Sequence, residues 1–597
     1  RGVEIHAVQR IRGLARDTRG LHELKTFGDP VGLKEAAVIP ADHKVKLHFE
    51  RARQAVHGDF ATNVALSLAK AAGKNPRELA ELIVASLPTS DLIRQTEIAG
   101  PGFINIFLND EAKFDVLKAI FTAGDSYGLA APNSGQKIMV EFVSANPTGP
   151  LHVGHGRGAV YGDALARLLS AAGHRVEREY YVNDAGRQMD ILATSVWIRY
   201  AQCAGSNIAL PENCYQGDYV AQYGQELFAE HGEVYLFDEA AIDQATEGLE
   251  SEAALDATIK KVKETLGEVG FKLFFDKALN TILADIKDDL SGFGIDFDTW
   301  FSEKSLFDSG KIFAAIERLK SSGDVYEKGG AWWFKTTAYG DEKDRVVVRD
   351  NGQPTYFASD IAYHFDKLDR GFDLAINIWG ADHHGYIARV KAGMQGLGLD
   401  PEQLKVLLVQ FAVLYRGGEK LAMGTRSGNF VALRELRDEI GSDAARFFYT
   451  QRKSEQHMDF DLDLAKAQSN ENPMYYVQYA HARICRLLTT AQERDIEFSQ
   501  PAEADFSLLA SEKEESLLKE LAKFPELVMS AANQYEPHQI TFYLRELATN
   551  FHSWYNTEKF LELDEDIRNA KLALSQAVRQ VLQNGLGIIG VAAPESM

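Results

Sequence analysis

Runs of mainly apolar residues divide the middle of the chain into predicted buried strands and the turns that follow them. The runs at 138–143 and 373–379 have the composition of strands covered on both faces, as in a parallel sheet. Each run leads into a helical stripe: Tyr161, Leu165, Leu168, Leu169 and Ala172 after the first, and Ile387, Val390, Met394 and Leu397 after the second. Residues 175–182 form another predicted strand, so the order strand, helix, strand predicts a right-handed βαβ unit with parallel strands.

Two later segments, 344–349 and 354–360, are predicted to begin the second half of the same α/β fold. Between the two halves, residues from about 188 to 298 are acidic, are mainly helical in pattern and lack phosphate-binding glycines. We interpret this interval as a helical insertion with a solvated acidic face.

The regions that flank the α/β centre have other patterns. Residues 39–132 predict a small α+β domain, with helices beginning near Asn63 and at Asn75-Pro76 and a strand-like alternation at 98–108. Apolar spacing is helical from 461 to 597, which predicts a C-terminal helical bundle. Residues 1–38 show no period, and we interpret them as a leader that is either disordered or of engineered origin.

Composition narrows the class of protein. The chain of 597 residues is long enough for several domains, and its 45% hydrophobic and 25% charged residues are ordinary for a globular protein. No apolar run is long enough to span a bilayer, and three cysteines form no disulfide framework, so we expect a cytoplasmic protein without membrane contact. The net charge of -22 argues against indiscriminate nucleic-acid binding, but local basic patches could still hold an RNA.

The glycine-rich turn at 146–158 is the candidate phosphate site. It lies between a predicted strand and a predicted helix, where glycines allow close approach and a helix start offers unpaired N–H groups to an anion. His152 and His155 add side-chain donors to this turn. His-x-Gly-His can also arise by chance in a long chain, but its place between strand and helix favours a nucleotide site.

The tetrapeptide His152-Val153-Gly154-His155 resembles the HIGH signature of class I aminoacyl-tRNA synthetases, and residues 140–149 resemble bacterial arginyl-tRNA synthetases in particular. The resemblance implies a Rossmann-like catalytic domain at 133–460 that activates arginine with ATP and transfers it to the 3'-terminal ribose of its tRNA. It implies catalytic roles for His152, Gly154 and His155, and ATP contacts for Pro150, His152, Gly154, His155 and Gly158.

Three carboxylates, Glu141, Asp360 and Asp382, are predicted to converge at one edge of the sheet. Carboxylates suit a guanidinium, which is planar and permanently charged. The resemblance implies that arginine is bound by Glu141, Ser144, Asn146, His155, Tyr356, Asp360 and Asp382, with His383 as the alternative to Asp382. Alternatively, the carboxylates form internal ion pairs with Arg345 or Arg349. The Asp382-His383-His384 run lacks further ligands at metal spacing, so we expect no metal site there.

A second signature of class I enzymes, a KMSKS-like loop, is altered in this chain. The segment at 419–429 has Ala422 and Thr425 where the signature has lysines. Lys420 and Arg426 are therefore the candidate catalytic cations, and Met423, Gly424 and Thr425 the candidate ATP contacts; alternatively, both cations are surface charges of an ordinary turn.

The C-terminal region resembles an anticodon-binding domain, and the N-terminal domain resembles one that touches the outer corner of tRNA. Aromatic and arginine side chains can stack on splayed bases. The candidate tRNA contacts are Tyr476, Tyr479, Arg483 and Met597, although a single aromatic residue is more often part of a core.

The implied partners are ATP with Mg²⁺, L-arginine and a tRNA for arginine, and we expect a monomer. The resemblance also implies that arginine activation needs bound tRNA, and no editing domain is evident. Two other classes stay open, namely a small-molecule nucleotidyltransferase and a non-catalytic RNA-binding paralogue.

Overall fold

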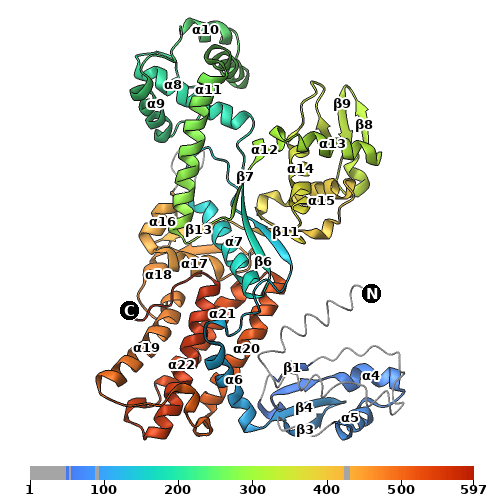
Figure 1. Cartoon of the computed structure of the whole chain (residues 1–597), viewed down its shortest axis with the longest axis vertical. Helices are drawn as coiled ribbons and strands as arrows, with labels where there is room; N and C mark the ends of the chain where they lie inside the picture. The colour runs from blue at the N-terminus through green and yellow to red at the C-terminus, as the bar shows by residue number, and fades with distance from the viewer. Residues whose placement is uncertain (1–48, 53–54, 88–92, 422–430) are drawn as a thin grey trace.

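The computed structural model describes residues 49–52, 55–87, 93–421 and 431–597. A central sheet carries two projections on one side, a helical insertion and a mixed lobe, and the C-terminal helices lie on the other side (Figure 1). The N-terminal domain lies beside the C-terminal helices, as salt bridges from Arg51 to Glu526 and from Lys113 to Glu515 indicate. The expected multidomain fold class is confirmed.

The N-terminal domain is a four-stranded antiparallel sheet with helices on it. Its strand order is β1-β2-β4-β3. Its elements are β1 (Phe49–Arg51), β2 (Phe60–Thr62), α4 (Val64–Ala72), α5 (Pro76–Ala85), β3 (Ile93–Ala99) and β4 (Phe103–Leu108). The single strand expected at 98–108 is wrong, because Gly100 and Gly102 adopt positive φ and fold it into the β3–β4 hairpin. Helix α6 (Asp110–Ala123) then leaves this domain and packs against C-terminal helices.

The central sheet has five parallel strands in the order β12-β11-β5-β6-β7. They are β5 (Lys137–Glu141), β6 (Arg175–Val182), β7 (Thr299–Ser302), β11 (Leu374–Gly380) and β12 (Leu404–Val409). Helix α7 (Val153–Ala171) crosses from β5 to β6, which confirms the predicted βαβ unit. The carboxyl ends of these strands share one edge, where open α/β sheets bind ligands.

The second half of the sheet differs from the prediction. The segment at 344–349 is β10 (Arg345–Val348), which belongs to a separate antiparallel sheet with β9 (Ala331–Phe334) and β8 (Val325–Lys328). A valine-rich run is compatible with a parallel or an antiparallel sheet, and only its partner strands determine which sheet it joins. Residues 356–360 open a helix, α14 (Tyr356–Asp369), and the strands missed by the pattern are β7 and β12.

The interval interpreted as a helical insertion contains four helices. It comprises α8 (Arg187–Cys203), α9 (Asp218–His231), α10 (Ala240–Thr246) and α11 (Ser251–Gly292), which breaks at Gly267. The mixed lobe contains α12 (Glu303–Asp308), α13 (Lys311–Ser322), the β8–β10 sheet, α14 and α15 (Ile387–Gly396). Helix α14 connects this lobe to the central sheet.

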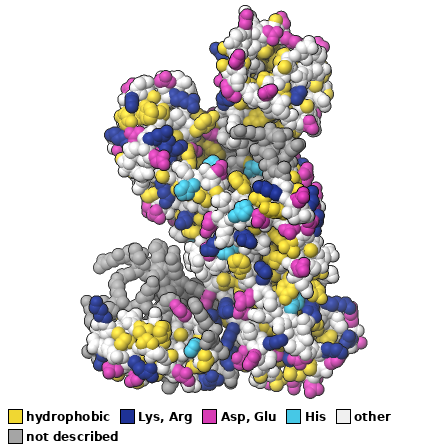
Figure 2. All heavy atoms as spheres, turned by 180° about the vertical axis from the view of Figure 1, so that it is seen from behind, with side chains coloured by type: hydrophobic (Ala, Val, Ile, Leu, Met, Phe, Trp, Pro, Cys, Tyr) yellow, Lys and Arg dark blue, Asp and Glu magenta, His cyan; other side chains and the backbone are white. Residues whose placement is uncertain are grey.

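A small sheet and the C-terminal helices complete the molecule. The sheet has the order β14-β13-β15, from Glu419–Lys420, Ala412–Arg416 and Met458–Asp461. The helices are α16 (Leu433–Ile440), α17 (Ser442–Thr450), α18 (Leu462–Lys466), α19 (Pro473–Glu493), α20 (Glu512–Gln534), α21 (His538–Tyr555) and α22 (Glu565–Ile588). Among the described residues, no helix is long and apolar enough to cross a membrane. Acidic and basic side chains are interspersed over the face in Figure 2.

Candidate active site

The histidine turn lies where β5 ends and α7 begins. His152 is the N-cap of α7, and its Nδ1 accepts a hydrogen bond from the Gly154 amide at 3.1 Å. His155 Nδ1 accepts in turn from the His152 amide at 3.3 Å. Each imidazole Nδ1 is therefore an acceptor, which leaves the proton of a neutral ring on Nε2.

The amides at the start of α7 already have partners. The Val153 amide donates to Val431 O at 3.1 Å, and the His155 amide donates to His152 O at 2.9 Å. The Gly154 amide donates to the His152 ring. The expectation of unpaired N–H groups is therefore wrong for residues 153–155. An anion at this turn would meet the imidazole N–H groups first.

Both histidines are uncharged at neutral pH. Burial, and then the neighbouring His152, lower the pKa of His155 to about 3. Burial also lowers the pKa of His152. The two rings lie 3.9 Å apart between centroids, so together they provide two neutral donors and no cation. Positive charge for a triphosphate must come from elsewhere.

The glycines of the turn differ in how much space a side chain would have at each position. A Cβ on Gly154 would lie 2.7 Å from the His152 ring, so this position needs glycine to keep the ring in its capping role. A Cβ on Gly158 would meet no described atom within 4 Å, so the backbone is open there. Pro150 precedes Leu151, whose carbonyl accepts from the Leu433 amide at 2.9 Å.

The backbone at the end of β5 is strained. Val143 and Ser144 have φ values of 66° and 42°, which non-glycine residues adopt rarely. Ser144 Oγ donates to Glu141 Oε1 at 3.0 Å and accepts from the Tyr181 amide at 3.1 Å. These bonds hold a conformation that such side chains otherwise avoid, a feature that clusters at functional sites.

Glu141 is buried and paired. Its Oε2 lies 2.5 Å from Lys367 Nζ, and the Lys367 side chain is fully buried. This partner differs from the expected Arg345, which pairs with Asp341 at 2.7 Å. The charge of Glu141 is thus already balanced inside the protein by a lysine that the sequence did not single out.

Asp360 lies near Glu141, as predicted. Burial, with Glu141 among the further causes, raises the pKa of Asp360 to about 6, and the Tyr386 hydroxyl donates to its carboxylate. Tyr356 lies one helical turn away and is 55% exposed. A Cβ on Gly186 would lie 3.2 Å from the Tyr356 hydroxyl, so this ring faces the segment that follows β6.

Two more carboxylates that the sequence did not reveal join this group. Glu303 is the first residue of α12 and is buried; burial, then Asp360 and Asp184, raise the pKa of Glu303 to about 7. Asp184 accepts from Ser302 Oγ at 2.6 Å and from the Lys304 amide at 2.9 Å. The sequence feature that could have identified these two carboxylates is their position directly after a strand: Asp184 follows β6 and Glu303 follows β7. The pattern did not predict β7.

Asp382 and Asn146 lie at the rim. Asp382 is 64% exposed, and its ion-pair partner is the adjacent His383 at 3.6 Å. Asn146 is exposed and donates to Gln188 Oε1 at 2.9 Å. The structure thus brings Glu141, Ser144 and Asp360 together and leaves Asp382 and Asn146 at the surface.

The described residues that follow the altered signature loop lie beside the histidine turn. Val431 binds the Val153 amide, and Ala432 pairs with His152. Lys420 is exposed on β14, opposite Tyr415. Met423, Gly424, Thr425 and Arg426 lie outside the described residues. Lys420 is thus the candidate cation whose position is described.

Three of the candidate tRNA contacts, Tyr476, Tyr479 and Arg483 on α19, cluster with aromatic residues of α21. Tyr479 stacks on His552 with centroids 5.5 Å apart, and Tyr476 lies 4.6 Å from the same ring. Arg483 lies over Tyr555 at 4.3 Å and donates to Asn556 at 2.8 Å. Met597 is 52% exposed, at the end of a tail whose Pro594 carbonyl lies 2.8 Å from the His481 ring on α19.

Metal binding has no prepared site among the described residues. No group of three or more His, Cys, Asp or Glu side chains in these ranges could hold an ion. His383 and His384 are exposed, and His383 lies 3.6 Å from the carboxylate of Asp382.

Comparisons with known proteins agree over nearly the whole chain. The family described as tRNA synthetases class I (R), catalytic domain, matches residues 116–462; an arginyl tRNA synthetase N terminal domain matches 32–108, and a DALR anticodon binding domain matches 477–597. An arginine–tRNA ligase of Hydrogenovibrio crunogenus is 58% identical over 576 residues, which cover 94% of this chain and 97% of that protein. One of Thioalkalivibrio sulfidiphilus is 55% identical, with 95% and 97% covered.

A solved structure shows the same fold. The arginyl-tRNA synthetase of Thermus thermophilus superposes with a TM-score of 0.72 at 22% identity, covering 97% of this chain and all of that one.

Proposed function

The chain belongs to the class I arginyl-tRNA synthetase family, and on this premise we propose that it is an arginine–tRNA ligase whose two half-sites meet at the carboxyl edge of the central sheet. It activates arginine with ATP and transfers the arginyl group to the 3'-terminal ribose of a tRNA for arginine. One observation carries the assignment of the site: the histidine turn, Asp184 and Glu303 follow strands of one parallel sheet, Glu141 ends one of these strands, and Asp360 on α14 lies near Glu141.

The amino acid half-site is proposed from its charge. Lys367 balances Glu141, so Asp360, Glu303 and Asp184 remain to receive a cation. A guanidinium presents five N–H donors in a plane and can satisfy two carboxylates at once. Lysine has a compact ammonium group and would leave part of this set unpaired, so selectivity needs no editing site.

The rim residues are proposed to bind the other end of arginine. Ser144, Asn146 and His155 lie along the turn that leads from β5 into α7, and Asp382 lies after β11. Tyr356 is proposed to flank the guanidinium from the exposed side. These assignments rest on the family resemblance and on their position along the sheet edge.

The nucleotide half-site is proposed to work by positioning. A carboxylate oxygen of arginine attacks the α-phosphorus of ATP, the bond to the bridging oxygen breaks, and pyrophosphate leaves. The Nε2–H groups of His152 and His155 donate to phosphate oxygens as charge builds on them, next to the open backbone at Gly158. Lys420 and Arg426 are proposed to supply the cation that neutral histidines cannot.

The second step transfers the activated acyl group. A ribose hydroxyl of the tRNA attacks the carbonyl carbon of arginyl-adenylate, and AMP leaves. The aromatic cluster of Tyr476, Tyr479 and Arg483 is proposed to hold the tRNA at its anticodon end, together with the exposed Met597. The N-terminal domain is proposed to touch the tRNA's outer corner.

Mg²⁺ is proposed to enter on the ATP phosphates, since no group of three or more His, Cys, Asp or Glu side chains among the described residues could hold the ion. We place the enzyme in the cytoplasm as a monomer. We also propose the divisions 39–132, 133–460 and 461–597 as its working domains.

The test is ATP–pyrophosphate exchange with each amino acid in turn, with and without tRNA. We expect exchange with arginine alone, and only when tRNA is present. Exchange with another amino acid would overturn the arginine half-site, and exchange without tRNA would overturn the tRNA requirement. No exchange under any condition, with tRNA binding retained, would favour a non-catalytic RNA-binding protein.

A further inference from the structure

A row of buried polar side chains crosses the central sheet at one level. Asn377 on β11 pairs in register with Glu141 on β5, and Glu141 pairs in register with Glu179 on β6. All three are buried, with exposed fractions of 0% to 7%. Residues in register on adjacent strands point to the same face of a sheet, so the row presents one line of acceptors to whatever covers that face.

Helix α14, together with its C-cap residue Arg370, supplies a partner for every member of this row. Lys367 Nζ binds Glu141 at 2.5 Å and Asn377 Oδ1 at 2.7 Å. Asn377 also contacts His364 Nε2 at 2.8 Å. Tyr363 and Arg370 bind Glu179. Positions 363, 364, 367 and 370 lie on one side of a helix, so a single helical face meets the entire row.

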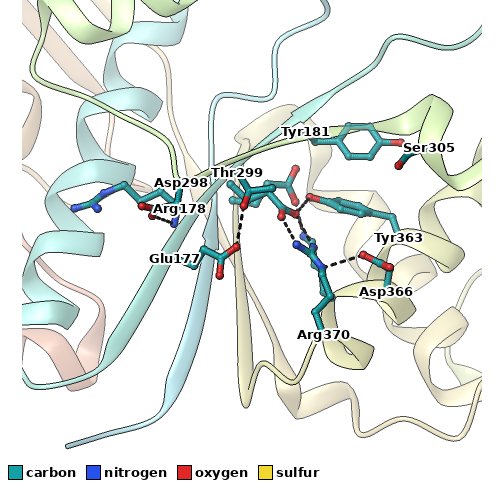
Figure 3. A network of polar contacts seen from close by, with 12 residues as sticks. Glu177, Arg178, Tyr181, Asp298, Thr299, Ser305, Tyr363, Asp366 and Arg370 are labelled. Atoms are coloured by element: carbon teal, nitrogen blue, oxygen red, sulfur yellow. Dashed lines mark hydrogen bonds and ion pairs between the residues drawn. The ribbon is translucent and has the colours of Figure 1, made fainter. Parts of the chain in front are cut away.

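The Glu179 end of the row is the most completely bonded. Its carboxylate accepts from the Tyr363 hydroxyl at 2.6 Å and from both terminal nitrogens of Arg370 at 2.6 and 3.0 Å. Figure 3 shows Tyr363 and Arg370 reaching from α14 toward the strands, with Asp366 beside Arg370. Arg370 Nε lies 2.9 Å from Asp366, and its guanidinium lies over Phe301 at 5.2 Å.

Stability alone does not account for these charges. Burying an ion pair costs several kcal/mol per ion, and well-packed apolar residues of the same volume often stabilise a fold equally well. What charged pairs add is direction, since a two-point bond between Arg370 and Glu179 fixes both the distance and the rotation of the helix. The face that meets the row also carries Asp360, one turn toward the start of α14.

We propose that this row and its four partners on α14 form a positioning clamp for arginine recognition. The clamp fixes the rotation and height of α14 on the sheet, so that Asp360 and Tyr356 at its first turns meet the guanidinium together with Glu303. Arg370 and Glu179 are positioning residues that act through the stiffness of α14. Arg370 is the C-cap of this helix, about 10 residues and some 15 Å along it from Asp360, and Glu179 holds it from β6. This inference rests on the proposed function, and it makes the clamp a determinant of the enzyme's affinity for arginine.

The nucleotide half-site should not respond to this clamp. The histidine turn is built on β5 and α7, and its hydrogen bonds run to residues 431–433 rather than to α14. A loosened clamp therefore raises the KM for arginine and leaves the KM for ATP in place. A general loss of folding would instead change both.

The experiment compares the variants Arg370→Met and Lys311→Met in tRNA aminoacylation, with arginine and ATP varied separately. Methionine keeps the packing of the Arg370 stem and removes both bonds to Glu179. Lys311 pairs with Asp366 on the same helix but joins it to α13 within the lobe, so Lys311→Met is the matched control. We expect Arg370→Met to raise the arginine KM about tenfold, less than the ~10²-fold cost of a 1 Å misplacement, with the ATP KM changed less than about twofold.

Two further variants make the outcome decisive. Arg370→Lys, which restores the charge but not the two-point bond, should recover part of the arginine affinity. Tyr363→Phe removes one bond to Glu179 and should raise the arginine KM about threefold, which decides the matter if Arg370→Met does not fold. An unchanged arginine KM in a folded variant, or equal increases for arginine and ATP, overturns the clamp. Absence of arginine-dependent charging by the unaltered enzyme would instead overturn the proposed function.

Discussion

Two carboxyl groups of the proposed arginine half-site, Asp360 and Glu303, titrate close to neutral pH in the free protein. The pKa of Asp360 is raised to about 6 and that of Glu303 to about 7, in both cases mainly by burial and further by neighbouring carboxylates. A guanidinium binds the ionised forms, so binding releases protons wherever these groups are partly neutral. Arginine affinity is therefore complete above both pKa values and is lost as pH falls through them.

We predict that the dissociation constant for arginine rises steadily as pH is lowered from 8 to 5.5. Each carboxyl can contribute up to about tenfold per pH unit below its pKa, because the charged form is then the minority species. Isothermal titration calorimetry in buffers of different ionisation enthalpy measures both the affinity and the protons released. In Glu303→Gln the weakening should begin about one pH unit lower, and a pH-independent affinity in the unaltered protein would contradict the prediction.

His155 is predicted to act on the rate rather than on arginine binding. With a pKa lowered to about 3 it stays neutral across the working range, and its contribution is one N–H donor to the phosphates. We expect His155→Ala to lower kcat about 10²-fold, the usual cost of one transition-state donor, with little change in the arginine KM. His457→Ala, at an exposed histidine, is the control. Rates measured in pre-steady-state adenylate formation that match the unaltered enzyme would remove His155 from this role.

At this scale the sequence located some residues and missed others for definite reasons. His152, His155 and Asp360 follow recognisable motifs, and the structure places Asp360 beside Glu141. Lys367 was missed because a single lysine in a helix carries no motif, and its role depends on which strand the helix covers. Glu303 was missed because its burial depends on β7, a strand of four residues.

Among the elements, α7 has a second anchor besides the histidine turn. Arg157, one turn into the helix, is 1% exposed, and its guanidinium donates to the carbonyls of Gln410, Lys453 and Gln456 at 2.7 to 2.8 Å. These carbonyls belong to the connections around β13 and β15. The guanidinium thus joins the start of α7 to the sheet that leads into the altered signature loop.

We predict that Arg157→Met destabilises the protein by at least about 3 kcal/mol, since buried carbonyls left without donors cost roughly 1–3 kcal/mol each. Urea unfolding followed by tryptophan fluorescence measures the change. Arg486→Met removes an exposed pair with Glu493 and should change stability by less than about 0.5 kcal/mol. Equal effects of the two substitutions would show that the carbonyl contacts of Arg157 contribute nothing.

Element types were predictable wherever the pattern was local. The helices at 64 and 76, the βαβ unit and the helical insertion follow from spacing and capping residues such as Asn75, whose side chain accepts from the Arg77 amide. Sheet membership was not local. The valines of β10 pair antiparallel with Trp332 and Trp333 rather than joining the central sheet, a choice made by residues more than ten positions away.

Across the whole molecule, one guanidinium connects parts that are distant in sequence. Arg446 on α17 is 1% exposed; it binds Asp163 of α7 at 2.5 Å, Phe293 O after α11 at 2.9 Å and Ile589 O after α22 at 3.0 to 3.1 Å. Helix α7, the insertion and the C-terminal bundle therefore share one buried junction. Asp163 is also held by Arg167 and Arg178, so it keeps partners if Arg446 is lost.

The junction predicts that Arg446→Met lowers both stability and cooperativity. Breaking a buried pair by removing one partner costs about 3–5 kcal/mol, and here two backbone carbonyls lose their donor as well. We expect the C-terminal bundle of the variant to unfold before the central sheet. Calorimetry should then show two transitions for the variant and one for the unaltered chain. Arg434→Met is the control, since Arg434 joins α16 to α11 alone through Asp285 and Asp289. A variant that melts at a lower temperature in a single transition would contradict this prediction. The apolar contacts around the junction would then carry the cooperativity, through the hydrophobic core that runs from the central sheet into the helical bundle.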